Sequence, residues 1–283
     1  MAGRFLYGTS SWSEKSWVGS FYPAGTRPGD MLSLYAGKFG TVEADTTYYA
    51  IPPREMVRGW RSKTPEGFVV SAKFPRSIVH AGEGAAPDAE KLLRLDRVGG
   101  DLERFLEVIQ ALGDKLGPLV LQLPYFNRGA FASLERFLER LEPFLDALPT
   151  HLRTAVEVRN KAWIGEDLAA ALRRHRAALV LVDIAYMPHP AELADRCDLV
   201  TADFAYARLI GDRKAVEAKT DRFDRIVIDH GERLDRWAEL LRSVLARVEV
   251  YTYANNHYAG HGPETIWDLA RRVGAGSSDA AAP

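Results

Sequence analysis

Short apolar, β-branched runs alternate with helix-like runs along almost the whole chain, and this alternation limits the fold more than any other feature. The strand-like runs are 5–12, 41–49, 68–75, 118–124, 154–160, 178–185, 205–211 and 248–256. Runs with helical apolar spacing include 30–40, 132–145, 166–176, 232–248 and 263–273. A (β/α)₈ barrel needs about 250 residues. The sequence therefore predicts an α/β fold, a single (β/α)₈ TIM-like barrel of eight parallel strands with surrounding helices.

A doubly wound open sheet is the structural alternative. It needs fewer strands or an insertion, and no G-x-G-x-x-G turn follows the run at 5–12. The weakest connection of the barrel interpretation is 187–197, which is short for a full helix. No change in composition marks a linker, so we expect one barrel domain over 1–274 and a disordered tail over 275–283.

The charge balance excludes some classes of partner. Lys plus Arg is 37 and Asp plus Glu is 38, for a net charge of −1. Broad binding of nucleic acid or anionic membranes needs a basic excess, so we expect neither. The single Cys197 fits a reducing compartment, and neither a secretory signal nor a membrane-spanning run is evident. We therefore expect a cytoplasmic protein.

Charged residues fall in the second halves of several expected strands, on one face of each. In 41–49, period-two alternation puts Glu43 and Asp45 opposite Val42 and Ala44. Other polar residues late in their runs are Lys73, Gln122, Glu157, Arg159, Asp183 and Arg208. In a barrel the outward strand face packs on helices, whereas the inward face opens at the C-terminal mouth. The sequence therefore predicts a polar site at that mouth.

Several motifs together resemble one known family. They are GTSSW (8–12), VEADTTYY (42–49), SAKFP (71–75) with His80, GPLVLQLP (117–124), AVEVRNKAW (155–163), YARLIG (206–211) and YANNHYAGHGPET (253–265). They resemble the YecE-like family, also called domain of unknown function 72. The resemblance covers nearly the whole chain and implies a TIM-barrel fold, but it implies no particular reaction.

The chain departs from the pattern of that family at three places. Asn160 stands where the family has His after Glu-x-Arg, and Ile210 replaces the His of Arg-Leu-His-Gly. The Phe-Asn-Asn run is Ala254-Asn255-Asn256 here. The two missing histidines weaken any general-base role at those positions.

Two interpretations of the inward charges stay open. Glu43 and Glu157 could act as an acid–base pair, with Lys73, Arg159 and Arg208 neutralising negative charge. Alternatively, these five groups neutralise one another as a charge network. Paired carboxylates also catalyse glycoside hydrolysis. Glycosidase barrels usually place these carboxylates on other strands, which disfavours glycoside hydrolysis here.

Metal binding is a weaker alternative. Glu157 and Asp183 lie on neighbouring strands, and oxygen ligands suit Mg²⁺ or Mn²⁺. The inward cations compete for the same carboxylates, and neither HExxH nor CxxC occurs. We therefore predict no cofactor and no metal ligand, with a divalent ion as the lesser possibility.

Residues 259–265 suggest an anion site. Gly260 and Gly262 precede a helix that opens at Pro263, so free backbone N–H groups are expected to point toward the mouth. A plain glycine-capped turn is the alternative. Tyr49 and Trp163 are candidates for stacking on a sugar or base, although rings at such positions also simply pack on helices.

The function that these features favour is an enzyme acting on a small anionic substrate, a phosphorylated sugar or a nucleotide-like compound, by carboxylate acid–base chemistry. The catalytic candidates are Glu43, Glu157, Lys73 and Asp183. The substrate-binding candidates are Asp45, Arg159, Arg208, Tyr49, Trp163, His80, Asn255, Asn256, Gly260 and Gly262. The alternatives are a non-catalytic barrel that binds a ligand or nucleic acid, and a metal-dependent phosphodiesterase or nuclease.

Overall fold

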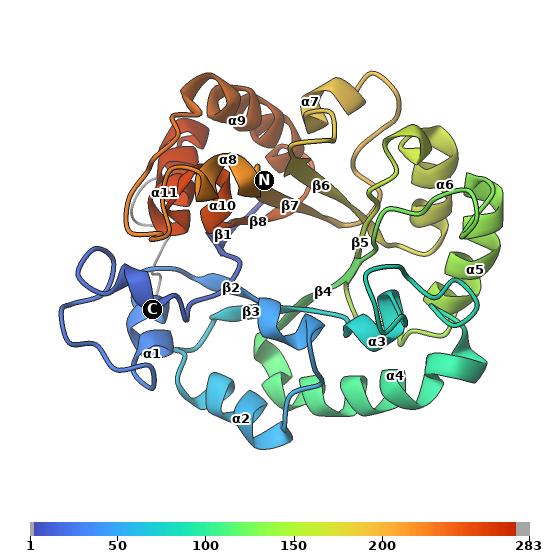
Figure 1. Cartoon of the computed structure of the whole chain (residues 1–283), viewed down its shortest axis with the longest axis horizontal. Coiled ribbons are helices and arrows are strands. Elements are labelled where there is room, and N and C mark those ends of the chain that lie inside the picture. The colour runs from blue at the N-terminus through green and yellow to red at the C-terminus, as the bar shows by residue number, and fades with distance from the viewer. Residues whose placement is uncertain (1–2, 276–283) are drawn as a thin grey trace.

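The eight expected strands form one parallel sheet that curls into a nearly closed barrel, surrounded by helices (Figure 1). The computed structural model describes residues 3–275. The strands are β1 (Phe5–Thr9), β2 (Thr41–Ala44), β3 (Val69–Lys73), β4 (Leu116–Gln122), β5 (Thr154–Glu157), β6 (Ala178–Ile184), β7 (Phe204–Gly211) and β8 (Glu249–Ala254). The predicted TIM-like barrel is confirmed, and the open doubly wound sheet is wrong. The predicted tail lies outside the described residues, except Ala275.

Helices follow the strands around the outside of the barrel. They are α1 (Met31–Ala36), α2 (Arg54–Ser62), α3 (Arg76–Val79), α4 (Leu95–Ile109), α5 (Leu134–Asp146), α6 (Glu166–Arg174), α7 (Pro190–Leu193), α8 (Arg213–Glu217), α9 (Gly231–Leu245), α10 (Asn256–Ala259) and α11 (Gly262–Val273). In α5 the buried residues include Phe137, Leu141 and Phe144, a spacing that puts one apolar stripe on the sheet. The connection after β6 holds only the one-turn α7.

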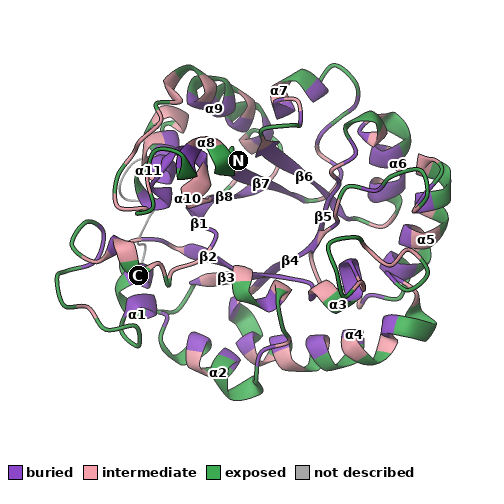
Figure 2. Cartoon of the chain, in the orientation of Figure 1, coloured by how far each residue is buried: buried purple, intermediate pink, exposed green. Residues whose placement is uncertain are grey.

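Two apolar clusters hold the barrel together. The outer cluster lies between the sheet and the helices, whose inner sides are buried and outer sides exposed (Figure 2). The inner cluster fills the barrel with Leu6, Val120, Ala155, Ala178, Val180, Val182, Phe204, Tyr206, Tyr251 and Tyr253. Because these rings and branched side chains fill the lower interior, polar side chains have room only toward the mouth.

Three strands end at least three residues earlier than the sequence predicts. The runs 5–12, 41–49 and 154–160 are strands only over β1, β2 and β5. After β2 the chain turns into a 3₁₀ helix, η2 (Asp45–Tyr48), and the Thr47 hydroxyl accepts a hydrogen bond from the backbone N–H of Lys73 at 2.9 Å. A side chain therefore replaces the strand partner at the end of β3, and Asp45 leaves the ladder.

The strand order runs from β1 through β8 to β2, so β1 and β2 are its two ends. The Tyr35 hydroxyl from α1 lies at this seam: it accepts a hydrogen bond from the Thr9 N–H at 2.8 Å and donates to the Thr41 carbonyl at 3.2 Å. Gly8 allows the close approach, because a Cβ there would lie 2.2 Å from the Thr41 oxygen. A tyrosine and a glycine thus close the barrel.

Candidate functional site

Six charged side chains form a continuous chain of opposite charges across the carboxyl end of the barrel. In order they are Asp45, Lys73, Glu43, Arg208, Glu157 and Arg159. Four of them belong to strands, Asp45 directly follows β2, and Arg159 lies two residues beyond the end of β5. Three carboxylates face three cations, so the network is neutral when all six are ionised. These six side chains therefore come together at the mouth, as the sequence predicts.

Arg208 occupies the centre of this network. Its Nη2 donates to Glu43 at 2.8 Å, and its Nη1 donates to Glu157 and to the Gln122 amide oxygen, the latter at 2.8 Å. The Tyr206 hydroxyl donates to the second oxygen of Glu43 at 2.8 Å. All of these carboxylate and guanidinium groups are buried. A buried charge is tolerable only with such partners, so Arg208 holds both glutamates in place.

The two ends of the network reach solvent. At one end Lys73 forms a close ion pair with Asp45, and its Nζ lies 3.7 Å from Glu43. At the other end Arg159 donates to Glu157 from Nε at 2.9 Å. The side chains of Asp45 and Arg159 are 27% and 21% exposed, respectively. A ligand in the mouth would therefore meet these end groups before the buried glutamates.

The electrostatic surroundings fix the protonation of Glu157. Burial alone would raise its pKa, but Arg208 and Arg159 outweigh burial and lower the pKa to about 2. Burial and the adjacent Glu43 raise the pKa of Tyr206, so its hydroxyl stays a neutral donor. At neutral pH Glu157 therefore has no proton to donate. The lowered pKa favours the role of a base, or of a fixed negative charge, over that of an acid.

Gln122 and Tyr206 complete the network, although the sequence interpretation gave neither a site role. Both lie on the inward faces of their strands. The same alternation that identified Arg208 identifies Tyr206, two residues before it. Alternation was therefore the available signal for Tyr206, whereas for Gln122 it was the position late in its run.

Asp183 lies elsewhere, and its predicted place in the mouth is wrong. On β6 the inward residues are Val180 and Val182, whereas Asp183 faces α9. There it accepts hydrogen bonds from Arg233 Nε at 2.8 Å and from Trp237 Nε1 at 2.8 Å. It anchors a helix to the outer face of the sheet and has no contact with the charge network among the interactions above.

The glycine loop after β8 does not offer the free N–H groups that the sequence predicts. The Gly262 N–H donates to the Asn256 side chain at 2.9 Å, and the Gly260 N–H donates to the Asn256 carbonyl at 2.7 Å. Asn255 caps α10 by accepting from the His257 N–H at 3.0 Å. Because these groups satisfy one another, the loop is a capped turn, which was the alternative interpretation.

Three other predicted binding residues have different surroundings. Trp163 stacks on Phe137 with ring centroids 5.1 Å apart, so it belongs to the outer core rather than the mouth. His80 is buried, and its ring accepts a hydrogen bond from the Gly82 N–H at 3.2 Å, which holds the loop after β3. Tyr49 alone of the three is exposed at the mouth.

In the described part of the chain, no three His, Cys, Asp or Glu side chains lie in an arrangement that could hold a metal ion. Glu157 and Asp183, the predicted pair, point to opposite faces of the sheet. Along residues 3–275, no helix is both long and apolar enough to cross a membrane.

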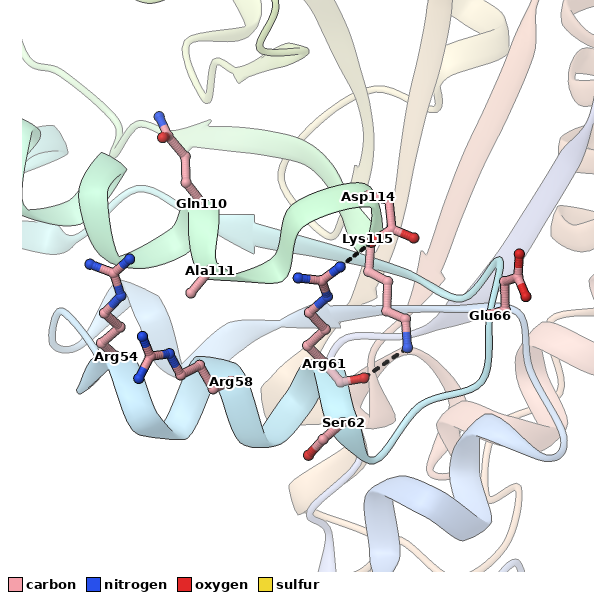
Figure 3. Close-up of a pocket in the computed structure, with 9 residues that line it drawn as sticks. All are labelled: Arg54, Arg58, Arg61, Ser62, Glu66, Gln110, Ala111, Asp114 and Lys115. Atoms are coloured by element: carbon pink, nitrogen blue, oxygen red, sulfur yellow. Dashed lines mark hydrogen bonds and ion pairs between the residues drawn. The ribbon is translucent and has the colours of Figure 1, made fainter.

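A groove of about 680 Å³ lies on the outer flank of the barrel, away from the mouth (Figure 3). Arg54, Arg58 and Arg61 of α2 line it together with Lys115. Each arginine pairs with a carboxylate, and the Lys115 ammonium donates to the Arg61 carbonyl at 2.7 Å. Its arginines are thus held by carboxylates on the outer surface, and none of the contacts above links the groove to the charge network.

Comparisons with known proteins agree with the barrel. The model of a family described as "Protein of unknown function DUF72" matches residues 6–283. The UPF0759 protein YecE of Escherichia coli K12 is 31% identical over 198 residues, which cover 66% of this chain and 64% of that protein. The YecE protein of Escherichia coli O157:H7 matches to the same extent. The matched part is thus less than two thirds of these curated relatives.

Solved structures show the same architecture. A DUF72 family protein from Thermotoga maritima superposes with a TM-score of 0.68 at 25% identity, covering 96% of this chain and 99% of the other. A DUF72 family protein from Enterococcus faecalis has the same TM-score at 21% identity, covering 99% and 98%. These similarities concern the fold and name no substrate.

Proposed function

We propose that this chain, which belongs to the DUF72 family, is an enzyme that binds a small anionic substrate at the barrel mouth and acts on it by proton transfer. The observation that carries the proposal is the charge network with its two solvent-reaching ends, Asp45 with Lys73 and Arg159. Catalysis in TIM barrels takes place at this face of the fold.

In this proposal the residues at the ends of the network and those at its centre have different roles. An anionic group of the substrate binds beside Arg159 and Lys73, where bidentate and point-charge donors are both at hand. Asp45 transfers a proton to or from the substrate, because it is the carboxylate of the network that reaches solvent. Glu43 and Glu157 act behind them by fixing Arg208 and, through Glu157, Arg159.

The ligand in this proposal is a small molecule rather than a nucleic acid bound along a broad basic face, in line with the net charge of −1. The lone cysteine is the reason to place the protein in the cytoplasm. Binding without turnover is the second candidate function, because Glu43 and Glu157 are buried and fully partnered.

Calorimetric titration with inorganic phosphate and ribose 5-phosphate tests the anion site. Arg159→Gln should weaken binding of both by about tenfold or more, the loss expected for a hydrogen bond to a charged group. Arg213→Gln is the matched control: Arg213 is exposed and pairs with Glu217 within α8, the helix after β7. The control should bind like wild type. No binding by wild type, or a loss confined to Arg213→Gln, would refute the proposed site.

Turnover is tested separately with Asp45→Asn. In a screen of phosphorylated compounds that bind, this variant should keep binding within a fewfold and lose product formation. Unchanged product formation would remove Asp45 from the mechanism. If wild type binds such compounds but transforms none, the non-catalytic candidate replaces the enzyme.

A further inference from the structure

Exposed tyrosines follow alternate strands at the mouth. Tyr49, Tyr125 and Tyr186 come after β2, β4 and β6, and they are 75%, 61% and 51% exposed. The carboxyl ends of all strands meet at one rim in a barrel, so the three rings belong to the same face as the charge network. Single exposed rings are ordinary, but three at one rim need a reason.

Tyr49 is linked to one end of the charge network through its neighbour. The Tyr49 ring packs edge-on against Tyr48 with centroids 5.4 Å apart. The Tyr48 ring lies 5.9 Å from the Lys73 ammonium. Arg159 is also close enough to Tyr48 to oppose the rise in its pKa that burial causes. Tyr49 is thus the solvent-facing surface of an aromatic pair beside the proposed anion site.

Tyr186 approaches the same cation from another strand. β5 and β6 are hydrogen-bonded neighbours, and Arg159 and Tyr186 each lie two residues beyond the end of their strand, so they share one part of the rim. Glu157 and Tyr186 also raise the pKa of Arg159 against the effect of burial. Arg159 follows β5, while Tyr48 and Tyr186 follow β2 and β6. One guanidinium at the mouth therefore lies near tyrosines that arrive from separate strands.

We infer that Tyr49 and Tyr186 form an aromatic frame for the ring of a nucleotide-like ligand whose phosphate binds at Arg159 and Lys73. This inference rests on the proposed function and names its substrate class. Tyrosine rings stack well on planar heteroaromatic bases, and exposed rings lose little conformational freedom when they do so. A phosphorylated sugar without a base would use the cations but leave both exposed rings uncovered.

Tyr125 provides a matched comparison. It lines a separate recess of about 550 Å³ between the loops after β3 and β4, together with Ala86, Pro87, Asn127 and other small residues. It has the same side chain at the same rim, yet none of the contacts above links it to Lys73 or Arg159. The inference therefore assigns the base to Tyr49 and Tyr186 and not to Tyr125.

Titration with three probes at one salt concentration tests the inference: inorganic phosphate, ribose 5-phosphate and adenosine 5′-monophosphate. Adenosine monophosphate should bind at least about tenfold more tightly than ribose 5-phosphate, as stacking on an aromatic side chain allows. Tyr49→Ala and Tyr186→Ala should each remove about fivefold or more of that advantage and leave phosphate binding unchanged. Tyr49→Phe, Tyr186→Phe and Tyr125→Ala should bind all three probes like wild type.

The outcomes separate this inference from the proposed function. If wild type binds phosphate but gains nothing from the base, the frame does not exist while the anion site survives. The frame is equally wrong if both alanine variants keep the full advantage, or if Tyr125→Ala loses as much as they do. If wild type binds none of the three probes, the anion site and the frame are both refuted.

Discussion

At the scale of single residues, Arg208 supplies the positive charge that allows Glu43 and Glu157 to be buried in the mouth of the barrel. Two buried carboxylates converge on its guanidinium, and Gln122 occupies a further donor. The attraction within such a network largely offsets the cost of burying its charges, so its net contribution to stability is small. The cost of breaking it is large, because a carboxylate that loses its partner stays buried.

Arg208→Met should therefore lower the free energy of unfolding by about 3–5 kcal/mol, measured by urea denaturation at pH 7. Glu43 and Glu157 would remain buried with one cation fewer. The control is Arg213→Met, which removes an exposed i,i+4 pair with Glu217 and should cost no more than about 0.5 kcal/mol. A loss below about 1 kcal/mol for Arg208→Met would mean that solvent reaches the glutamates and that the network is not buried.

At the scale of elements, alternation predicted the inward charges but could not orient β6. In β2, β5 and β7 a charge alternates with apolar residues, so Glu43, Glu157 and Arg208 reveal the inward face. In β6 every residue before Asp183 is apolar and buried, because both faces of the strand are covered. The partners Arg233 and Trp237, 50 and 54 residues later in the chain, show which way Asp183 points.

The prediction of free N–H groups in the loop after β8 was wrong for a different reason. Gly260 and Gly262 do mark a tight turn before α11, with Gly260 at a φ of +108°. Their N–H groups are taken by the side chain and carbonyl of Asn256, which a glycine pattern alone does not predict. The glycine pattern therefore predicted the turn correctly, but it wrongly predicted free N–H donors at Gly260 and Gly262.

Among the connecting elements, α7 has a titratable cap. His189 precedes Pro190, is buried, and accepts a hydrogen bond from the Ala191 N–H at 3.2 Å. Its ring also packs edge-on against Trp237 of α9 at 5.3 Å. Burial lowers its pKa to about 4, with Arg233 and Arg236 adding to the effect and Asp183 and Glu192 opposing it.

The stability contributed by neutral His189 should be complete above about pH 6.5 and be lost as the pH falls toward 4. Over that range His189 binds a proton in the unfolded chain but stays neutral in the folded protein, so unfolding becomes more favourable as the pH falls. His189→Asn keeps a capping acceptor but does not titrate, so its free energy of unfolding should fall less than that of wild type between pH 6.5 and 4. Urea denaturation at four pH values measures this. His151→Asn, at an exposed position, should follow wild type, and parallel curves for both variants would contradict the prediction.

At the scale of the whole molecule, the seam between β1 and β2 determines whether the site keeps its shape. Glu43 lies two residues beyond Thr41, whose carbonyl accepts from Tyr35 and whose hydroxyl lies 2.7 Å from the Tyr253 hydroxyl. The Tyr253 hydroxyl also lies 2.8 Å from that of Ser71 on β3. Two tyrosines, from α1 and β8, thus hold the strand that presents Glu43. No local pattern in the sequence pairs them, because each contact joins distant segments.

Tyr35→Phe should lower the free energy of unfolding by about 1–3 kcal/mol, because the buried Thr9 N–H loses its acceptor. Tyr49→Phe, which changes an exposed hydroxyl, should have no measurable effect. Gly8→Ala should cost more than Tyr35→Phe, because its Cβ would overlap the Thr41 carbonyl. Hydrogen exchange locates the effect: amides of β1 and β2 should exchange faster in Tyr35→Phe, while those of β4 and β5 keep their protection. Uniformly faster exchange would mean that the seam opens only when the whole barrel unfolds, and the mouth could then not be loosened from this side alone.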